Sequence, residues 1–230
     1  ENLETDLPEK KIGFYAYHSY MLPPVRHRPS TKIVPALANI NLCRIHGPGN
    51  PVCSEQVAYL EILKNWKTLV PEVYDRGYWS NLADPGLIFP SFDKVVRQIQ
   101  VDREYDLSGF RIECFHHWAS EGPLLYLAMR LMWSVETDGT SILEDYYRGW
   151  FGPAGKEIGK FYGLFDEALA SKDFHAGGAW DLPAVYDAEL LSFANEHLTQ
   201  AEQLVEDWPL RNRVATVRKA FEATRDFIHM

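Results

Sequence analysis

The sequence is poor in the features that define several classes of protein. It has 3 cysteines in 230 residues, and no apolar run approaches the roughly 18 residues of a membrane-spanning helix. Basic residues are also scarce, because 23 Lys and Arg stand against 32 Asp and Glu and give a formal net charge of -9. So few cysteines exclude a disulfide-built scaffold. The acidic balance argues against nucleic acids and anionic membranes as the main partners.

The cysteines leave one question open. Cys43 and Cys53 are close enough in the chain to form a disulfide, although an odd count is not typical of a disulfide framework. Neither Cys43 nor Cys114 has the surroundings of a nucleophile, so we expect both to be buried thiols.

The pattern of apolar residues predicts an α/β protein. Strands are expected at 12–17, 33–43, 69–74 and 109–112, and helices from residue 54 and at 92–105. From Pro123 onward the pattern is helical, with helices expected at 153–171, 183–206 and 210–228. Four strand units are too few to close an eight-stranded barrel. We therefore predict the C-terminal half of a TIM-type (β/α) barrel over residues 1–122 and a helical region over 123–230.

Aromatic residues are abundant, at 13% of the chain with 7 Trp and 12 Tyr. Most of them are expected in the core, which the 46% hydrophobic content is sufficient to build. Tyr and Trp near loops also suit a sugar-binding cleft, because flat rings cover the apolar faces of pyranoses. Tyr15 and Tyr17 share one face of the first strand, where they either contact a ligand or fill the barrel interior.

Two carboxylates follow expected strands. Active sites of barrel enzymes lie at the carboxyl ends of the strands, and a carboxylate there can act as acid, base or nucleophile, or can bind a sugar hydroxyl. Glu113 equally fits an ion pair with Arg111 or Arg130, and Asp75 fits an ordinary turn. We predict Glu113 as the principal catalytic carboxylate and Asp75 as its assistant.

Histidine and aromatic side chains complete the candidate site. His116 and His117 are adjacent, but neighbours on an extended chain point in opposite directions. No third ligand stands near them at a recognisable spacing, so neither a metal nor a cofactor is expected. Trp79 and Trp118 are the expected stacking platforms. The predicted substrate-binding residues are Tyr15, Tyr17, His18, His46, Trp79, His116, His117 and Trp118.

Ordered motifs add a family resemblance. They lie at 14–18, 43–46, 50–53, 66, 74–75, 109–113, 126–133 and 146–154. Over roughly residues 12–170 the chain resembles the C-terminal part of a bacterial domain family, number 4838 among the domains of unknown function. Members of that family are assigned to glycoside hydrolase family 163. One departure is Ser54, where the family pattern has Asn after the second cysteine.

The resemblance implies a TIM-barrel glycosidase, related in architecture to α-glucuronidases and N-acetylhexosaminidases and secreted or periplasmic. It implies endo-acting cleavage of N-acetylglucosamine-containing N-glycans. The front half of such a barrel, which in related enzymes often carries the catalytic acid, is absent from these 230 residues. The expected partners are therefore an oligosaccharide and either the missing barrel half or another chain. The alternatives are a non-catalytic carbohydrate-binding module and a structural half-barrel that folds only against its partner.

Overall fold

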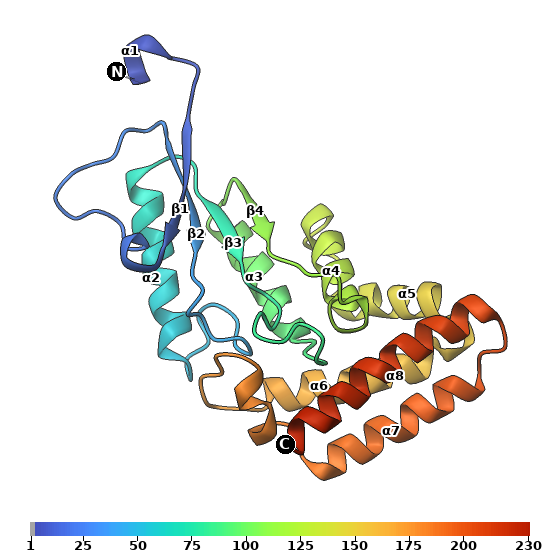
Figure 1. The fold of residues 1–230 in the computed structure, drawn as a ribbon. Helices are drawn as coiled ribbons and strands as arrows, with labels where there is room; N and C mark the ends of the chain where they lie inside the picture. Colours follow the sequence, from blue (N-terminus) through green and yellow to red (C-terminus); the bar gives the residue numbers. More distant parts are fainter. Residues whose placement is uncertain (1–2) are drawn as a thin grey trace.

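The fold is built on one parallel sheet of four strands. The computed structural model describes residues 3–230 and is shown in Figure 1. Strands β1 (Ile12–Tyr17), β2 (Ile33–Ala38), β3 (Tyr74–Gly77) and β4 (Gly109–Ile112) lie in the order β1-β2-β3-β4. Helix α1 (Leu3–Asp6) precedes the sheet, and a short 3-10 helix, η1 (His18–Tyr20), follows β1. The expectation of an α/β fold is confirmed.

Helices cover one face of the sheet. Parallel neighbours need a crossover, which α2 (Ser54–Leu69) supplies between β2 and β3 and α3 (Phe92–Glu104) supplies between β3 and β4. The buried cluster on this face consists of Ala16, Leu37, Tyr59, Leu63, Trp66, Val70, Val73 and Val101. We call this side of the sheet the covered face.

The opposite side, which we call the open face, is polar and aromatic. The register aligns Tyr15 with Ala36, Ala36 with Tyr74, and Tyr74 with Gly109. A Cβ at residue 109 would lie 2.7 Å from the Tyr74 ring, which explains the glycine there. No helix among the described residues lies over this face, and Tyr15 is 46% exposed.

The second half of the chain is helical. It contains α4 (Trp118–Trp133), α5 (Gly139–Phe151), η2 (Gly152–Ala154), α6 (Gly155–Ala170), η3 (Ala179–Ala184), α7 (Ala188–Gln203) and α8 (Trp208–Ile228). Figure 1 shows α6, α7 and α8 beyond the carboxyl ends of the strands. A second buried cluster runs from Val95 and Ile99 of α3 through α4 to Phe161 and Phe221. No described helix is long and apolar enough to cross a membrane.

Several expected boundaries need correction. A strand at 69–74 is wrong, because the apolar face of α2 continues to Leu69 and β3 begins only at Tyr74. The second strand ends at Ala38 instead of residue 43. The helix expected from residue 183 starts at Ala188, because Pro183 lies in η3 and Asp187 caps α7. The strands at 12–17 and 109–112 are confirmed.

Candidate functional site

The open face carries a cluster of charged and aromatic side chains where β3 and β4 end. Arg76 and Arg111 are register partners. Arg76 forms an ion pair with Glu113, and Arg111 donates a hydrogen bond to the Tyr15 hydroxyl. The Arg76 guanidinium also lies over the ring of Tyr78, 4.9 Å from its centre, and 5.7 Å from that of Tyr15. We call these five residues the strand-end cluster.

Glu113 is held in place by backbone and side chain together. Its N–H donates to the Gly77 carbonyl at 3.1 Å, which continues the β3–β4 pairing one step beyond β4. The Glu113 side chain is 36% exposed, whereas that of Arg76 is 11% exposed. The arrangement presents a partly exposed carboxyl group that is fixed by a guanidinium and is within reach of a ligand on the open face.

Asp75 lies on the covered face, away from Glu113. Successive residues of a strand point to opposite sides, so Arg76 faces the strand-end cluster while Asp75 points toward the helices. The Tyr59 hydroxyl donates to Asp75 Oδ1 at 3.1 Å, and the residue is 4% exposed. Burial raises the pKa of Asp75 to about 7, although Tyr59 and Lys94 oppose this shift. The structure does not bring the two predicted catalytic carboxylates together.

Around Asp75 is a buried polar network. Burial, with the Arg44 cation, lowers the pKa of Lys94 to about 7. The Lys94 ammonium donates to the Tyr78 carbonyl at 3.4 Å, and Gln98 donates to Asp102 at 2.9 Å. A cavity of about 10 Å³, lined in part by Asp75, Lys94 and Gln98, has room for about one water molecule. This network connects β3 to α3 beneath the strand-end cluster.

The predicted aromatic platforms have different surroundings. Trp118 is 61% exposed at the start of α4, so its ring is accessible. Trp79 is only 2% exposed and stacks on Phe110 at 6.0 Å between ring centres. Gly77 makes room for this indole, because a Cβ there would lie 2.1 Å from its nitrogen. Trp79 thus packs in the core and presents no free face to a sugar.

The predicted histidines are dispersed. His18 is exposed in η1, where its φ of 51° is in the left-handed region, and Tyr17 is half-buried beside it. His116 and His117 are exposed in the loop before α4. His46 is buried below the sheet's carboxyl end, with one ring nitrogen 2.7 Å from the Lys172 carbonyl. His46 therefore lies outside the strand-end cluster.

The thiols differ in burial. Cys43 is buried, as expected, but Cys114 is exposed, so the expectation of a buried thiol is wrong there. Cys114 lies just beyond β4, where the chain leaves the sheet and apolar neighbours no longer cover it.

Two features were not foreseen from the sequence. Glu121 is buried, and its carboxylate accepts a 2.7 Å hydrogen bond from the Phe115 N–H, which fixes the loop after β4. An acidic residue in the first turn of a helix directly after a strand-end loop was an available signal. The second feature is a groove of about 1010 Å³ between α5 and α6, which includes Lys160 and His197 and lies in the helical region.

Together, the sheet and its strand-end cluster define an α/β protein with a polar, aromatic candidate site at the carboxyl ends of parallel strands. The family model described as "Domain of unknown function (DUF4838)" matches residues 1–163, and the chain belongs to this family. No curated protein matches the chain, and no solved structure does.

Proposed function

We propose that the chain supplies the second half of a TIM-type barrel glycoside hydrolase, with Glu113 as the principal carboxylate. The observation that carries this proposal is the position of Glu113, partly exposed after β4 and paired with Arg76 beside exposed Tyr15. Barrel glycosidases gather their carboxylates at this end of the strands. The sequential parallel strands, with α2 and α3 on one face, support it as consecutive β/α units.

In this proposal Glu113 acts on the sugar directly, held in place by its ion pair with Arg76. It attacks the sugar carbon, or it orients a substrate N-acetyl group whose own carbonyl oxygen attacks. Both routes retain the configuration of the sugar carbon, and both need a second carboxyl group that protonates the leaving oxygen, about 5–5.5 Å from Glu113 where Glu113 is the nucleophile. A separation of about 6.5–9.5 Å would instead make Glu113 the base that activates a water molecule, with inversion. We assign the second carboxyl group to further barrel strands, from another segment or another chain, which would also cover the open face.

The proposed substrate is an N-acetylglucosamine-containing glycan. Tyr15 and Tyr78 offer rings for the apolar face of a sugar, and Arg76 and Arg111 offer N–H donors for its hydroxyl and carbonyl oxygens. The resemblance to a family whose members are assigned to glycoside hydrolase family 163 favours the same class of substrate.

The test begins with intact mass and sizing of the purified material, which establish whether a second polypeptide accompanies the 26.5 kDa chain. Release of glycan from an N-glycopeptide is then measured for the wild type, Glu113→Gln and a control. Glu136→Gln is a matched control, because Glu136 also pairs with an arginine (Arg103, 2.7 Å) but in the turn between α4 and α5. We expect Glu113→Gln to lower kcat by about 10²–10⁴ and the control to leave it unchanged. Turnover by Glu113→Gln within a few-fold of wild type would refute the assignment.

A non-catalytic carbohydrate-binding role is the second candidate. It is favoured by the exposure of Trp118. This candidate requires that a chitooligosaccharide binds without turnover and that Trp118→Ala weakens binding at least about tenfold. Calorimetry together with the glycan-release assay separates the two functions.

A further inference from the structure

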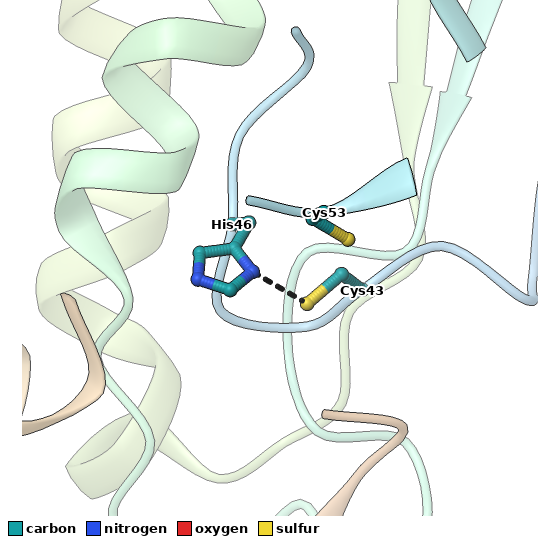
Figure 2. A group of neighbouring side chains, drawn as sticks. All are labelled: Cys43, His46 and Cys53. Carbon is teal, nitrogen blue, oxygen red and sulfur yellow. Dashed lines mark hydrogen bonds between the residues drawn. The ribbon is translucent and has the colours of Figure 1, made fainter. Parts of the chain in front are cut away.

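A cluster of sulfur and nitrogen atoms lies at the junction of the sheet and the helical region. Cys43, His46 and Cys53 are all buried, and their potential ligand atoms lie within 4.8 Å of one another. Figure 2 shows the His46 ring and the Cys53 sulfur directed toward Cys43. All three residues come from the loop between β2 and α2, and Cys53 is the N-cap of α2. This cluster is separate from the strand-end cluster and independent of the proposed hydrolase activity.

A candidate fourth donor, outside the group of three whose ligand atoms lie within 4.8 Å of one another, comes from the helical half of the chain. His175, in the segment between α6 and η3, places Nδ1 3.9 Å from Cys53 Sγ and is exposed on the solvent side of the cluster. The two segments are already joined by hydrogen bonds. The Arg44 N–H donates to the Ala176 carbonyl at 2.7 Å, and the Ala176 N–H points at Cys43 Sγ at 3.4 Å.

The surroundings of His46 fix which ring nitrogen is free. Its Nε2 lies 2.7 Å from the Lys172 carbonyl, which can only accept a hydrogen bond, so Nε2 carries the proton. Nδ1 therefore has the lone pair, and it lies 3.3 Å from Cys43 Sγ. A hydrogen bond from the far ring nitrogen to a backbone carbonyl is the usual way in which a metal-binding histidine is oriented.

The loop that carries these groups is shaped to bring them together. Gly49 has a φ of 80°, and a Cβ there would lie 2.7 Å from a Leu60 methyl group. Gln56, buried at the start of α2, donates to the Cys43 carbonyl at 3.2 Å and also to the His46 carbonyl. These contacts return the chain from His46 to Cys53 in a single compact turn.

We propose that Cys43, His46, Cys53 and His175 bind a structural zinc ion. With Zn–S near 2.3 Å and Zn–N near 2.0–2.1 Å, tetrahedral coordination places sulfur and nitrogen ligands about 3.6 Å apart. The two sulfur–nitrogen separations, 3.3 Å and 3.9 Å, lie on either side of that value. Two thiolates and two imidazoles favour zinc over the hard cations Mg²⁺ and Ca²⁺. Binding releases the two thiol protons, and the two thiolates neutralise the ion in its buried position.

The ion would join the two halves of the chain. The loop after β2 would be fastened to the segment after α6, next to the carboxyl end of the sheet. A disulfide between Cys43 and Cys53 is the competing chemistry, but it would leave the oriented lone pair of His46 without a role.

The experiment uses the full chain, purified without chelator, and measures its metal content by mass spectrometry. We expect about one zinc per chain, loss of that zinc with a strong chelator, and a melting temperature lowered by about 5–10 °C until zinc is restored. Added Co²⁺ should then give the visible absorption of tetrahedral thiolate coordination. This spectrum does not depend on any variant and so remains informative if the variants fail to fold.

The variants Cys43→Ser, Cys53→Ser and His46→Ala should lose zinc, whereas Cys114→Ser and His229→Ala should retain it, because both of these residues are exposed and lie outside the cluster. His175→Ala should keep zinc with an affinity at least about tenfold lower, and an unchanged affinity would remove His175 from the site. A mass lower by two hydrogens, with one reactive thiol instead of three, would identify the disulfide and overturn the proposal. So would zinc content at background in material with three free thiols that does not take up Co²⁺.

Discussion

At the scale of single residues, the buried Asp75 makes the stability of the folded protein depend on pH in a way that can be measured. Its ordinary pKa of 3.8 rises to about 7 in the folded protein, because burial disfavours the charge. Between those values the folded state holds a proton that the unfolded chain has lost. The free energy of unfolding therefore falls as pH rises from about 4 to about 7. Asp75→Asn keeps an acceptor for the Tyr59 hydroxyl but does not titrate. The variant should therefore lack this decrease in the free energy of unfolding, which is on the order of 3 kcal/mol in the wild type.

The measurement is urea unfolding at pH steps from 4 to 7. The free energy of unfolding should decrease less steeply with pH for Asp75→Asn than for the wild type. Asp226→Asn is the control, because that side chain is largely exposed on α8. Lys94 affects stability at higher pH. Because its pKa is about 7 in the fold and 10.5 in the unfolded chain, its contribution to the free energy of unfolding increases as pH rises between these two values. Identical slopes for Asp75→Asn and wild type would show that Asp75 is ionised in the fold.

The same residue marks the limit of what the sequence could predict about the site. Position after an expected strand led to the choice of Glu113 and Asp75, but Asp75 lies within β3, and alternation along β3 and β4 places the two side chains on opposite faces. Asp75 was expected to assist Glu113, and its contacts are instead with Tyr59. The Arg76 partner of Glu113 depends on the pairing of β3 with β4, which local spacing does not reveal.

At the scale of elements, the starts of α7 and α8 show that an aspartate at the N-cap position does not always form a capping hydrogen bond. Asp187 caps α7 through its side chain, which accepts from the Leu190 N–H at 2.8 Å. Asp207 occupies the same position before α8 but makes no side-chain cap bond there. We expect Asp187→Ala to lower the free energy of unfolding by about 1 kcal/mol and Asp207→Ala to lower it by much less.

Chemical denaturation of the two variants side by side checks this difference, since both substitutions remove one acidic residue. Equal losses would mean that the charge at the helix start, and not the hydrogen bond, stabilises these helices.

Strands were harder to locate than helices for a physical reason. Repeated apolar spacing in the sequence predicts the long amphipathic helices α6 and α8, and their expected ranges agree closely with the structure. β3 is four residues, Tyr-Asp-Arg-Gly, and has almost no apolar signal of its own. It becomes a strand because β2 and β4 pair with it on both sides.

At the scale of the whole molecule, α3 joins the sheet to the helical region. Val101 belongs to the buried cluster under the sheet, whereas Ile99 belongs to the cluster that extends through α4, α6 and α8. These two residues are two positions apart on one rigid helix. Disruption of either cluster should therefore weaken the other, and the ranges 1–122 and 123–230 should unfold together.

Ile99→Ala and Val101→Ala test this coupling as a matched pair. Each removes buried methyl groups and should cost about 1–4 kcal/mol. If the clusters are coupled, both variants shift one common transition, seen alike by helix circular dichroism and by tryptophan fluorescence. Trp66 lies in the sheet cluster and Trp150 on α5, so each half contains a fluorescent reporter.

Two separate transitions would instead establish two independent domains. In that case Val101→Ala would shift only the unfolding transition of the sheet, and Ile99→Ala only that of the helices. Because a metal bridge at Cys43 and His175 would add to the same coupling, the comparison is made both with zinc and with chelator, and the common transition should survive in each.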